Sequence, residues 1–187
     1  ILLIGAHLGS WEIGGQLLAR LGRTVNLVVL EREEARLRAL FNQALQDRQF
    51  RILTADADPL RSVPIMAALR RGEIVALHGD RAFGGADAPV PFLGGTARFP
   101  TGPYALAAIT GAPWFQVFVV RERVGHYRFF THPPEFVPRE ALRRPAGRLS
   151  ESAALYARRL EDACRQYPFQ WFNIFPFWEE TAPATPS

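Results

Sequence analysis

Apolar and polar positions follow one another along this chain in blocks that predict strands and helices in turn. Short continuous apolar runs, typical of strands buried on both faces, cover residues 1–4, 25–30, 51–54 and 73–78. Between them, apolar residues recur with helical spacing over residues 10–21, 33–49 and 59–71. This alternation predicts an α/β fold with a mainly parallel central sheet flanked by helices on both faces.

The second half of the chain is less regular. Residues 79–103 are rich in glycine and proline, and we interpret them as one ordered loop over the carboxyl edge of the sheet. A short helix is expected next, then a β-hairpin toward the C-terminal end, an irregular stretch and a last helix, over residues 104–110, 114–131, 133–148 and 150–166. We expect a single domain over 1–178 and a flexible tail over 179–187.

Candidate chemistry lies where two predicted strands end. His7 follows the first apolar run, and Glu12 falls in the first turn of the next helix. Open parallel sheets bind ligands at the carboxyl ends of their strands, and an imidazole beside a carboxylate can act as a general base. The alternative is a structural histidine that is merely hydrogen-bonded at a strand end. Asp80 and Arg81 end another buried strand, so Asp80 could bind an acceptor hydroxyl and Arg81 a phosphate. Alternatively, Asp80 caps a turn and Arg81 is solvated.

Two further stretches are candidates for binding. Gly94 and Gly95 would let the backbone approach a ligand closely, and Thr96 and Arg98 could then donate to a phosphate or a carbonyl oxygen. Residues 167–178 hold six Phe and Trp side chains and one Tyr. Such a segment fits an acyl-chain channel or a membrane interface, and equally a strap that packs over the core.

Composition narrows the classes of function. All 22 basic residues are arginines and the net charge is +4, which suits an anionic membrane surface or an acidic partner. The absence of lysine excludes a P-loop, and neither a Gly-x-Ser-x-Gly elbow nor a zinc-binding pattern occurs, so no metal site is predicted. The one cysteine, Cys164, is expected to pack in the core rather than to act as a nucleophile. No nucleic-acid-binding module is visible, and nucleic acid is not expected as a partner.

Together the motifs resemble the bacterial lipid A biosynthesis (lauroyl/myristoyl) acyltransferases, within the wider lysophospholipid acyltransferase-like superfamily. The resemblance rests on four motifs in the same order across the whole chain. They are His7-x-x-x-x-Glu12, Gly79-Asp80-Arg81, Val90-Pro91-Phe92-Leu93-Gly94 leading into Thr101-Gly102, and Tyr167-Pro168-x-Gln170-Trp171-Phe172. The glutamate of the superfamily's Phe-Pro-Glu-Gly-Thr-Arg block is missing from residues 92–98, which favours the lipid A branch over glycerol-phosphate acceptors.

The resemblance implies transfer of a fatty acyl chain from acyl carrier protein or coenzyme A to a hydroxyl or amine of a lipid or glycolipid. The thioester is then a donor substrate, and no cofactor is expected. By the same resemblance His7 is the general base and Glu12 orients it. Arg32, Arg81 and Arg98, with backbone amides near Gly94 and Gly95, are the expected donors to an oxyanion or phosphate.

The resemblance also implies a place at the cytoplasmic face of the bacterial inner membrane. The protein would be peripheral there, or anchored by an N-terminal segment that we expect to precede this sequence. Two other functions remain open at this point. The same base could activate water, giving an acyl thioesterase, or the fold could serve as a non-catalytic lipid-binding module.

Overall fold

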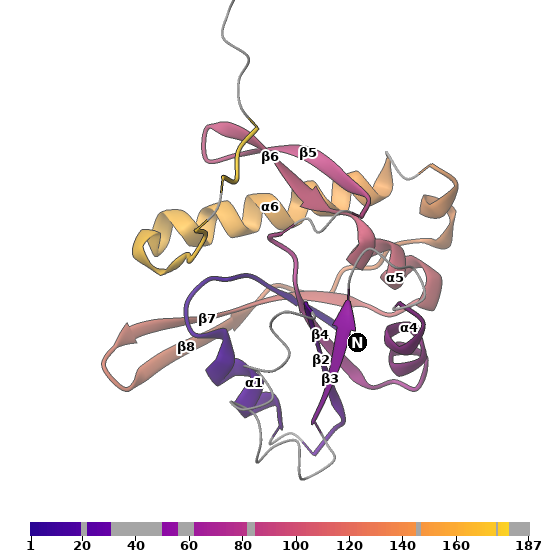
Figure 1. Ribbon diagram of the computed structural model, residues 1–187, viewed down its shortest axis with the longest axis horizontal. Coiled ribbons are helices and arrows are strands. Elements are labelled where there is room, and N and C mark those ends of the chain that lie inside the picture. The colour runs from indigo at the N-terminus through magenta and orange to yellow at the C-terminus, as the bar shows by residue number, and fades with distance from the viewer. Residues whose placement is uncertain are drawn as a thin grey trace, which may run out of the picture.

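The computed structural model describes residues 1–19, 22–30, 50–55, 62–81, 85–144, 147–174 and 176–179 (Figure 1). In chain order the elements of the first half are β1 (Leu2–Gly5), α1 (Trp11–Ala19), β2 (Val25–Leu30), β3 (Phe50–Ala55), α4 (Ser62–Arg70), β4 (Ile74–His78), β5 (Asp87–Phe92) and β6 (Gly95–Pro100). Those of the second half are α5 (Gly102–Thr110), β7 (Trp114–Arg123), β8 (His126–Thr131), the 3-10 helix η2 (Arg139–Arg143), α6 (Arg148–Gln166) and the 3-10 helix η3 (Pro168–Gln170).

A six-stranded sheet forms the centre of the fold, in the order β3-β2-β4-β1-β7-β8. All neighbouring strands are parallel except β8, which returns antiparallel beside β7. The predicted α/β class, the mainly parallel sheet and the C-terminal β7–β8 hairpin are thus confirmed. β1 lies between β4 and β7, which explains why its residues Leu2–Ile4 are all buried and all apolar.

Helices cover both faces of this sheet (Figure 1). On one face α1 packs over an apolar cluster whose buried members are Leu3, Val25, Leu27, Val29, Phe50 and Ile74. On the other face, α4, α5 and α6 share the larger core with Leu2 and Ile4 of β1. Cys164 of α6 is buried in that core, and burial raises the pKa of its thiol to about 12. The thiol is therefore un-ionised, which agrees with the expected packing role.

The prediction of one long loop over residues 79–103 was wrong. Strands β5 and β6 form a separate antiparallel hairpin that packs on α6, across this helix from the central sheet (Figure 1). Its turn is Leu93-Gly94, where both residues have positive φ angles of 50° and 86°, as a tight hairpin turn requires. Pro89 and Pro91 occupy the exposed positions of β5, so the alternation of buried and exposed residues is hard to recognise in the sequence. A two-stranded sheet tolerates these prolines because both of its strands are edge strands.

Other predicted elements are confirmed with shifted ends or lie beyond the described residues. The stretch 133–148 contains η2 and the start of α6, so it is less irregular than expected. The predicted helix 33–49 lies outside the described residues, as does the expected tail beyond residue 179. In the part of the chain that is described, no helix is long and apolar enough to cross a bilayer.

Candidate active site

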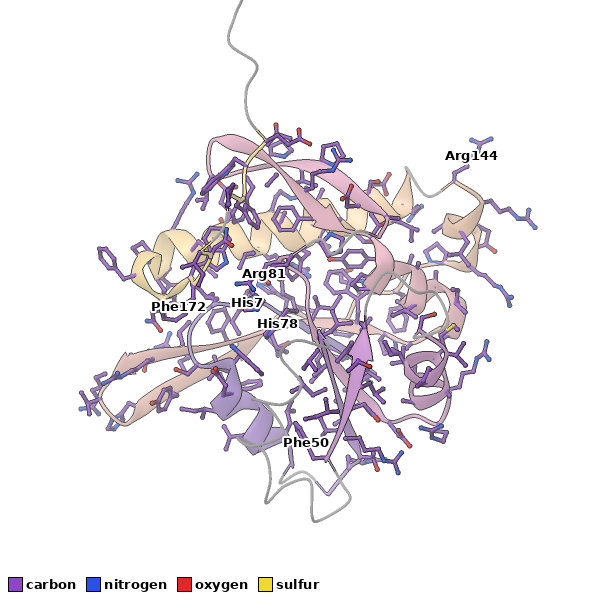
Figure 2. All side chains as sticks on the ribbon, viewed as in Figure 1. His7, Phe50, His78, Arg81, Arg144 and Phe172 are labelled. Atoms are coloured by element: carbon purple, nitrogen blue, oxygen red, sulfur yellow. The ribbon has the colours of Figure 1, made fainter. Side chains whose placement is uncertain are left out.

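The pairing of β1 with β4 brings His7 and Asp80 to the same edge of the sheet. Gly5 of β1 is in register with His78 of β4, and His7 and Asp80 each follow two residues later. Figure 2 shows His7, His78, Arg81 and Phe172 gathered near the middle of the molecule. The predicted convergence of the two strand ends therefore exists, at the carboxyl edge where parallel sheets form their sites.

Asp80 holds His7 through two hydrogen bonds. The ring Nδ1 of His7 lies 2.9 Å from Oδ1 of Asp80, and the backbone N–H of His7 donates to Oδ2 over 2.9 Å. The Asp80 side chain is 2% exposed and that of His7 is 14% exposed. Burial alone would raise the pKa of Asp80, but the hydrogen bonds from His7 outweigh it and the net pKa is lowered. Asp80 is therefore an ionised carboxylate, and it holds a hydrogen on Nδ1 of His7.

The C-terminal segment closes the site from the other side. Trp171 donates its Nε1–H to Oδ2 of Asp80 over 3.1 Å. The backbone N–H of Phe172 donates to the carbonyl of His7 over 2.8 Å, and that of Gly9 donates to the carbonyl of Gln170 over 2.7 Å. The loop that carries His7 is thus paired with a segment some 160 residues later, which fixes the position of the imidazole.

Gly9 is required for this loop to fit. Its φ angle is +71°, and a Cβ at this position would lie 2.0 Å from the carbonyl oxygen of Val119. The same carbonyl accepts the backbone N–H of Ser10, so α1 starts directly against β7. Only glycine allows the turn between His7 and α1 to come this close to the sheet.

His78 completes the surroundings of the His7 ring. Its Nδ1 lies 3.2 Å from Nε2 of His7, and the two rings meet edge-on with centroids 4.2 Å apart. The Trp11 ring contacts the other side of His78 with centroids 4.7 Å apart. Burial, followed by repulsion from His7, lowers the pKa of His78 to about 3, so its ring is neutral. His78 therefore packs against Trp11 and also contacts the ring of His7.

The expected partner Glu12 is not the residue on the His7 ring. Glu12 lies half-buried in the first turn of α1, and within the described residues its carboxylate makes no hydrogen bond or ion pair. The orienting contact comes from Asp80, which was expected to bind an acceptor hydroxyl but has its oxygens engaged by His7 and Trp171. Arg32, another predicted donor, lies outside the described residues.

Within the described residues, the glycine-rich group makes no hydrogen bond or ion pair with His7 or Asp80. Gly94 forms the β5–β6 turn, and Gly95 makes room for Trp178, whose Cδ1 would lie 2.4 Å from a Cβ at that position. Thr96 is exposed, and its carbonyl accepts the backbone N–H of Glu179. Arg98 forms ion pairs with Asp87 at 2.8 Å and with Glu179 at 2.7 Å. These four residues stabilise the hairpin and its contact with the C-terminal segment.

Arg81 does lie at the site. It directly follows Asp80, and its Nη2 donates to the carbonyl of Phe172 over 3.3 Å. The structure thus brings together His7, Asp80 and Arg81 of the predicted residues. Among the residues that it describes, no group of three or more His, Cys, Asp or Glu could hold a metal ion.

A narrow apolar cavity begins beside this cluster. It has a volume of about 50 Å³ and lies between α1 and the sheet. His78, Gly5 and Ala6 line it near the His7 loop, and Leu18 of α1 and Leu27 of β2 line it farther along the helix. Almost all of its lining is apolar, which suits a hydrocarbon chain rather than a polar ligand.

The aromatic C-terminal segment divides into a buried and an exposed part. Trp171 and Phe177 pack with Phe92 of the hairpin, at ring centroid distances of 5.3 and 5.4 Å. Phe169 and Ile174 are 95% and 93% exposed. The packing interpretation is therefore confirmed for Trp171 and Phe177, while an acyl-chain channel or a membrane interface stays a prediction.

Sequence reasoning missed Trp171 and His78 as members of the site. Trp171 could have been suspected only from its motif, because its contact with Asp80 spans 91 residues. His78 carried a clearer signal, since it stands two residues before Asp80 at the end of the same strand. The register of parallel strands turns that spacing into a contact with His7.

The sequence matches the model of a known protein family. The chain matches the bacterial lipid A biosynthesis acyltransferase profile over residues 1–180. A search of curated protein sequences gave no significant match. Because the profile covers nearly the whole chain, including every residue of the His7 cluster, this protein belongs to the bacterial lipid A biosynthesis acyltransferase family.

Proposed function

We propose that this chain transfers a fatty acyl group from a thioester donor to a hydroxyl or amine of a lipid A precursor, with His7 as general base. The observation that carries the proposal is the contact of buried Asp80 with Nδ1 of His7. It leaves the lone pair of the neutral ring on Nε2, the nitrogen that can accept a proton. Family membership supports an acyltransferase of lipid A biosynthesis, and the geometry supports this particular base.

In the proposed reaction Nε2 of His7 accepts the proton of the acceptor hydroxyl as its oxygen attacks the thioester carbonyl. The tetrahedral intermediate then collapses, the carbon–sulfur bond breaks and the thiolate leaves. His7 returns its proton to the thiolate or to solvent. Asp80 keeps its charge throughout and stabilises the imidazolium, as a carboxylate does behind a catalytic histidine.

Arg81 is proposed to stabilise negative charge beside the base. Its guanidinium suits the oxyanion of the intermediate or a phosphate of the acceptor. Glu12 is proposed as a second acidic group of the site, for binding the acceptor or supporting the histidine loop. Its half-buried carboxylate has no hydrogen-bonding partner among the described residues and follows His7 by five positions.

The acyl chain is proposed to enter the apolar cavity beside His78. The cavity is lined by Leu8, Leu18 and Leu27, and it starts next to the strand end that carries His7. Its volume of about 50 Å³ corresponds to a few water molecules. A long acyl chain would therefore have to displace lining side chains, and the chain length accepted would depend on how far they move.

A peripheral contact with an anionic membrane is also proposed, through the exposed part of residues 169–174. Phe169, Phe172 and Ile174 face solvent. The side chain of Gln170 bonds to the backbone of Arg121 in both directions, which places the exposed arginine of β7 beside these apolar groups. Apolar side chains flanked by arginines suit the interface of an anionic bilayer. Because Phe172 also contacts His7, a lipid acceptor could reach the base from this surface.

Vesicle sedimentation tests the membrane contact. We expect Phe169→Asp to reduce binding to phosphatidylglycerol vesicles at least severalfold, and to leave the weaker binding to phosphatidylcholine vesicles little changed. Phe136→Asp is the matched control, because Phe136 is also exposed, at 69%, but lies outside this segment. Equal binding by the two variants would reject this surface.

The proposed base is tested with His7→Ala in an assay that follows a radiolabelled acyl group from acyl carrier protein or coenzyme A to a lipid A precursor. We expect the folded variant to lose about 100- to 10,000-fold in rate. His126→Ala is the control, since His126 is exposed on β8. Transfer at the normal rate by folded His7→Ala would overturn the proposal. Release of free fatty acid without an acceptor would favour a thioesterase, and tight lipid binding without turnover a binding module.

A further inference from the structure

The contact between His78 and the base nitrogen of His7 has no role in the reaction proposed above. Nδ1 of His78 lies 3.2 Å from Nε2 of His7, within hydrogen-bonding distance. Two neutral imidazoles can form this bond only if one nitrogen carries a hydrogen and the other a lone pair. The question is therefore which of the two rings donates.

The charge of Asp80 decides it. The carboxylate is ionised and lies against Nδ1 of His7, so the base form of His7 carries its hydrogen on Nδ1 and its lone pair on Nε2. His78 must then carry its own hydrogen on Nδ1 and donate it. The ring of His78 is neutral, because burial and repulsion from His7 keep its pKa at about 3. The charged or titratable groups that act on it are His7, Asp80 and Arg81.

We propose that His78 is a positioning residue that donates its Nδ1–H to the lone pair of His7 Nε2, so that an acceptor hydroxyl must replace His78 to reach the base. An imidazole nitrogen has one lone pair in the ring plane, and it cannot accept both donors at full strength. His78 thus stabilises the neutral, proton-accepting form of His7 while the site is empty. This inference rests on the proposed function only in its second half, since the tautomer of His78 is a property of the free protein.

The surroundings of His78 allow such an exchange. The ring lines the apolar cavity between α1 and the sheet, and Trp11 contacts it from the side with centroids 4.7 Å apart. An acyl chain that enters this cavity would press on His78 directly. Occupation of the cavity by the donor would then help to release Nε2 for the acceptor, which couples the two substrates at one side chain.

Nitrogen-15 NMR of the histidine rings in the free protein tests the first half. Where the spectrum shows His7 in its base form, we expect both His78 and His7 to have a protonated Nδ1 and an unprotonated Nε2. Observation of His78 with its hydrogen on Nε2 would overturn the inference. That result would leave His7→Ala and its acyl-transfer assay unaffected, so the two proposals can fail separately.

Variants of His78 test the second half. His78→Leu removes the donor, which destabilises neutral His7. We expect the acid limb of kcat/KM and the NMR titration of His7 to move to higher pH by about half to one unit. His78→Asn restores an N–H donor near the position of Nδ1 and should move both back. His126→Leu controls for loss of a histidine and should leave both unchanged. An unshifted His7 titration in folded His78→Leu would contradict the proposal, even if that variant had no activity.

Discussion

The site around His7 and the β5–β6 hairpin both contain candidate functional residues, but their polar groups differ in burial and in the location of their partners. Asp80 is buried, and its donors come from His7 and Trp171, which lie 73 and 91 residues away along the chain. Arg98 is half exposed, and its partners Asp87 and Glu179 lie on the same surface. A buried carboxylate needs every one of its partners, whereas an exposed ion pair can exchange them for water.

This difference indicates which polar residues are the better candidates for function. The hairpin's glycines are explained by its own folding, because Gly94 has the φ angle of the turn and Gly95 leaves space for Trp178. The residues around His7 have no comparable need to be polar, and an apolar strand end would fold with less cost. Substitutions in the two regions should therefore separate loss of activity from loss of stability.

The largest effect is expected for Asp80→Asn. The amide can still accept the N–H groups of His7 and Trp171 through its oxygen, but its NH₂ group then faces Nδ1 of His7. That arrangement favours the wrong tautomer of His7, with the hydrogen on Nε2. We expect the rate of acyl transfer to fall by at least about 100-fold, measured at saturating donor. A rate within a factor of three of the wild type would show that Asp80 does not orient the base.

A pH series should reveal the buried imidazole of His78. Its pKa is about 3 in the folded protein against 6.5 in an exposed histidine. The unfolded chain therefore binds a proton that the folded protein does not, and the free energy of unfolding falls as the pH drops below 6.5. The loss from this group is up to about 1.4 kcal/mol per pH unit, continuing to about pH 3.

Urea unfolding between pH 6.5 and 4.5 measures this slope. Asp80 adds little to it, because its lowered pKa makes its stabilisation fade only below the usual carboxyl value of 3.8. His78→Leu should flatten the slope, while any part due to His132, whose pKa is also lowered by burial, stays in both proteins. Equal slopes in the two proteins would mean that His78 becomes protonated without cost in the folded state.

Gly95→Ala should affect stability and not activity. The new Cβ would meet the Trp178 ring, with Cδ1 at 2.4 Å, so the ring must shift from its place over the hairpin. We expect a loss of about 1–3 kcal/mol in the free energy of unfolding. Acyl transfer per folded molecule should stay within twofold of the wild type. A large loss of activity in the folded variant would instead indicate that the glycine-rich group takes part in substrate binding.

The smallest effect is expected for Arg98→Ala. Its two ion pairs are exposed, and water and salt screen such pairs so well that they add little to the stability of the fold. Thermal melting should change by a few degrees at most, and the KM for the acceptor should be unchanged. A KM raised tenfold would support the original prediction that Arg98 binds a substrate phosphate.

Much of the fold could be predicted from the sequence because buried parallel strands leave a local signal. The apolar run 1–4 is followed by Gly5 and the run 25–30 by charged residues, and both runs are strands of the central sheet. The hairpin 87–100 was missed because Pro89 and Pro91 argue against a strand, although Ala88, Val90 and Phe92 alternate with them. Proline is compatible with these positions only because β5 is an edge strand, which is a property of the tertiary fold.

Some members of the site were predictable from the sequence, but its hydrogen bonds were not. The positions of His7, Asp80 and Arg81 after predicted strands are enough to identify them as candidates. The choice of Asp80 over Glu12 as the partner of His7 depends on the register of β1 against β4, which no local pattern encodes. Trp171 was beyond reach for the same reason, since the C-terminal segment pairs with the His7 loop through backbone bonds.

The most direct measurement is a double-mutant cycle on acyl transfer with His7→Ala, Asp80→Asn and both changes together. If Asp80 acts only through His7, the double variant should be no slower than His7→Ala alone, because residues that work as one unit do not add. If the two losses instead multiplied, Asp80 would contribute to the reaction separately from His7, and the account of an Asp80-oriented base would be contradicted.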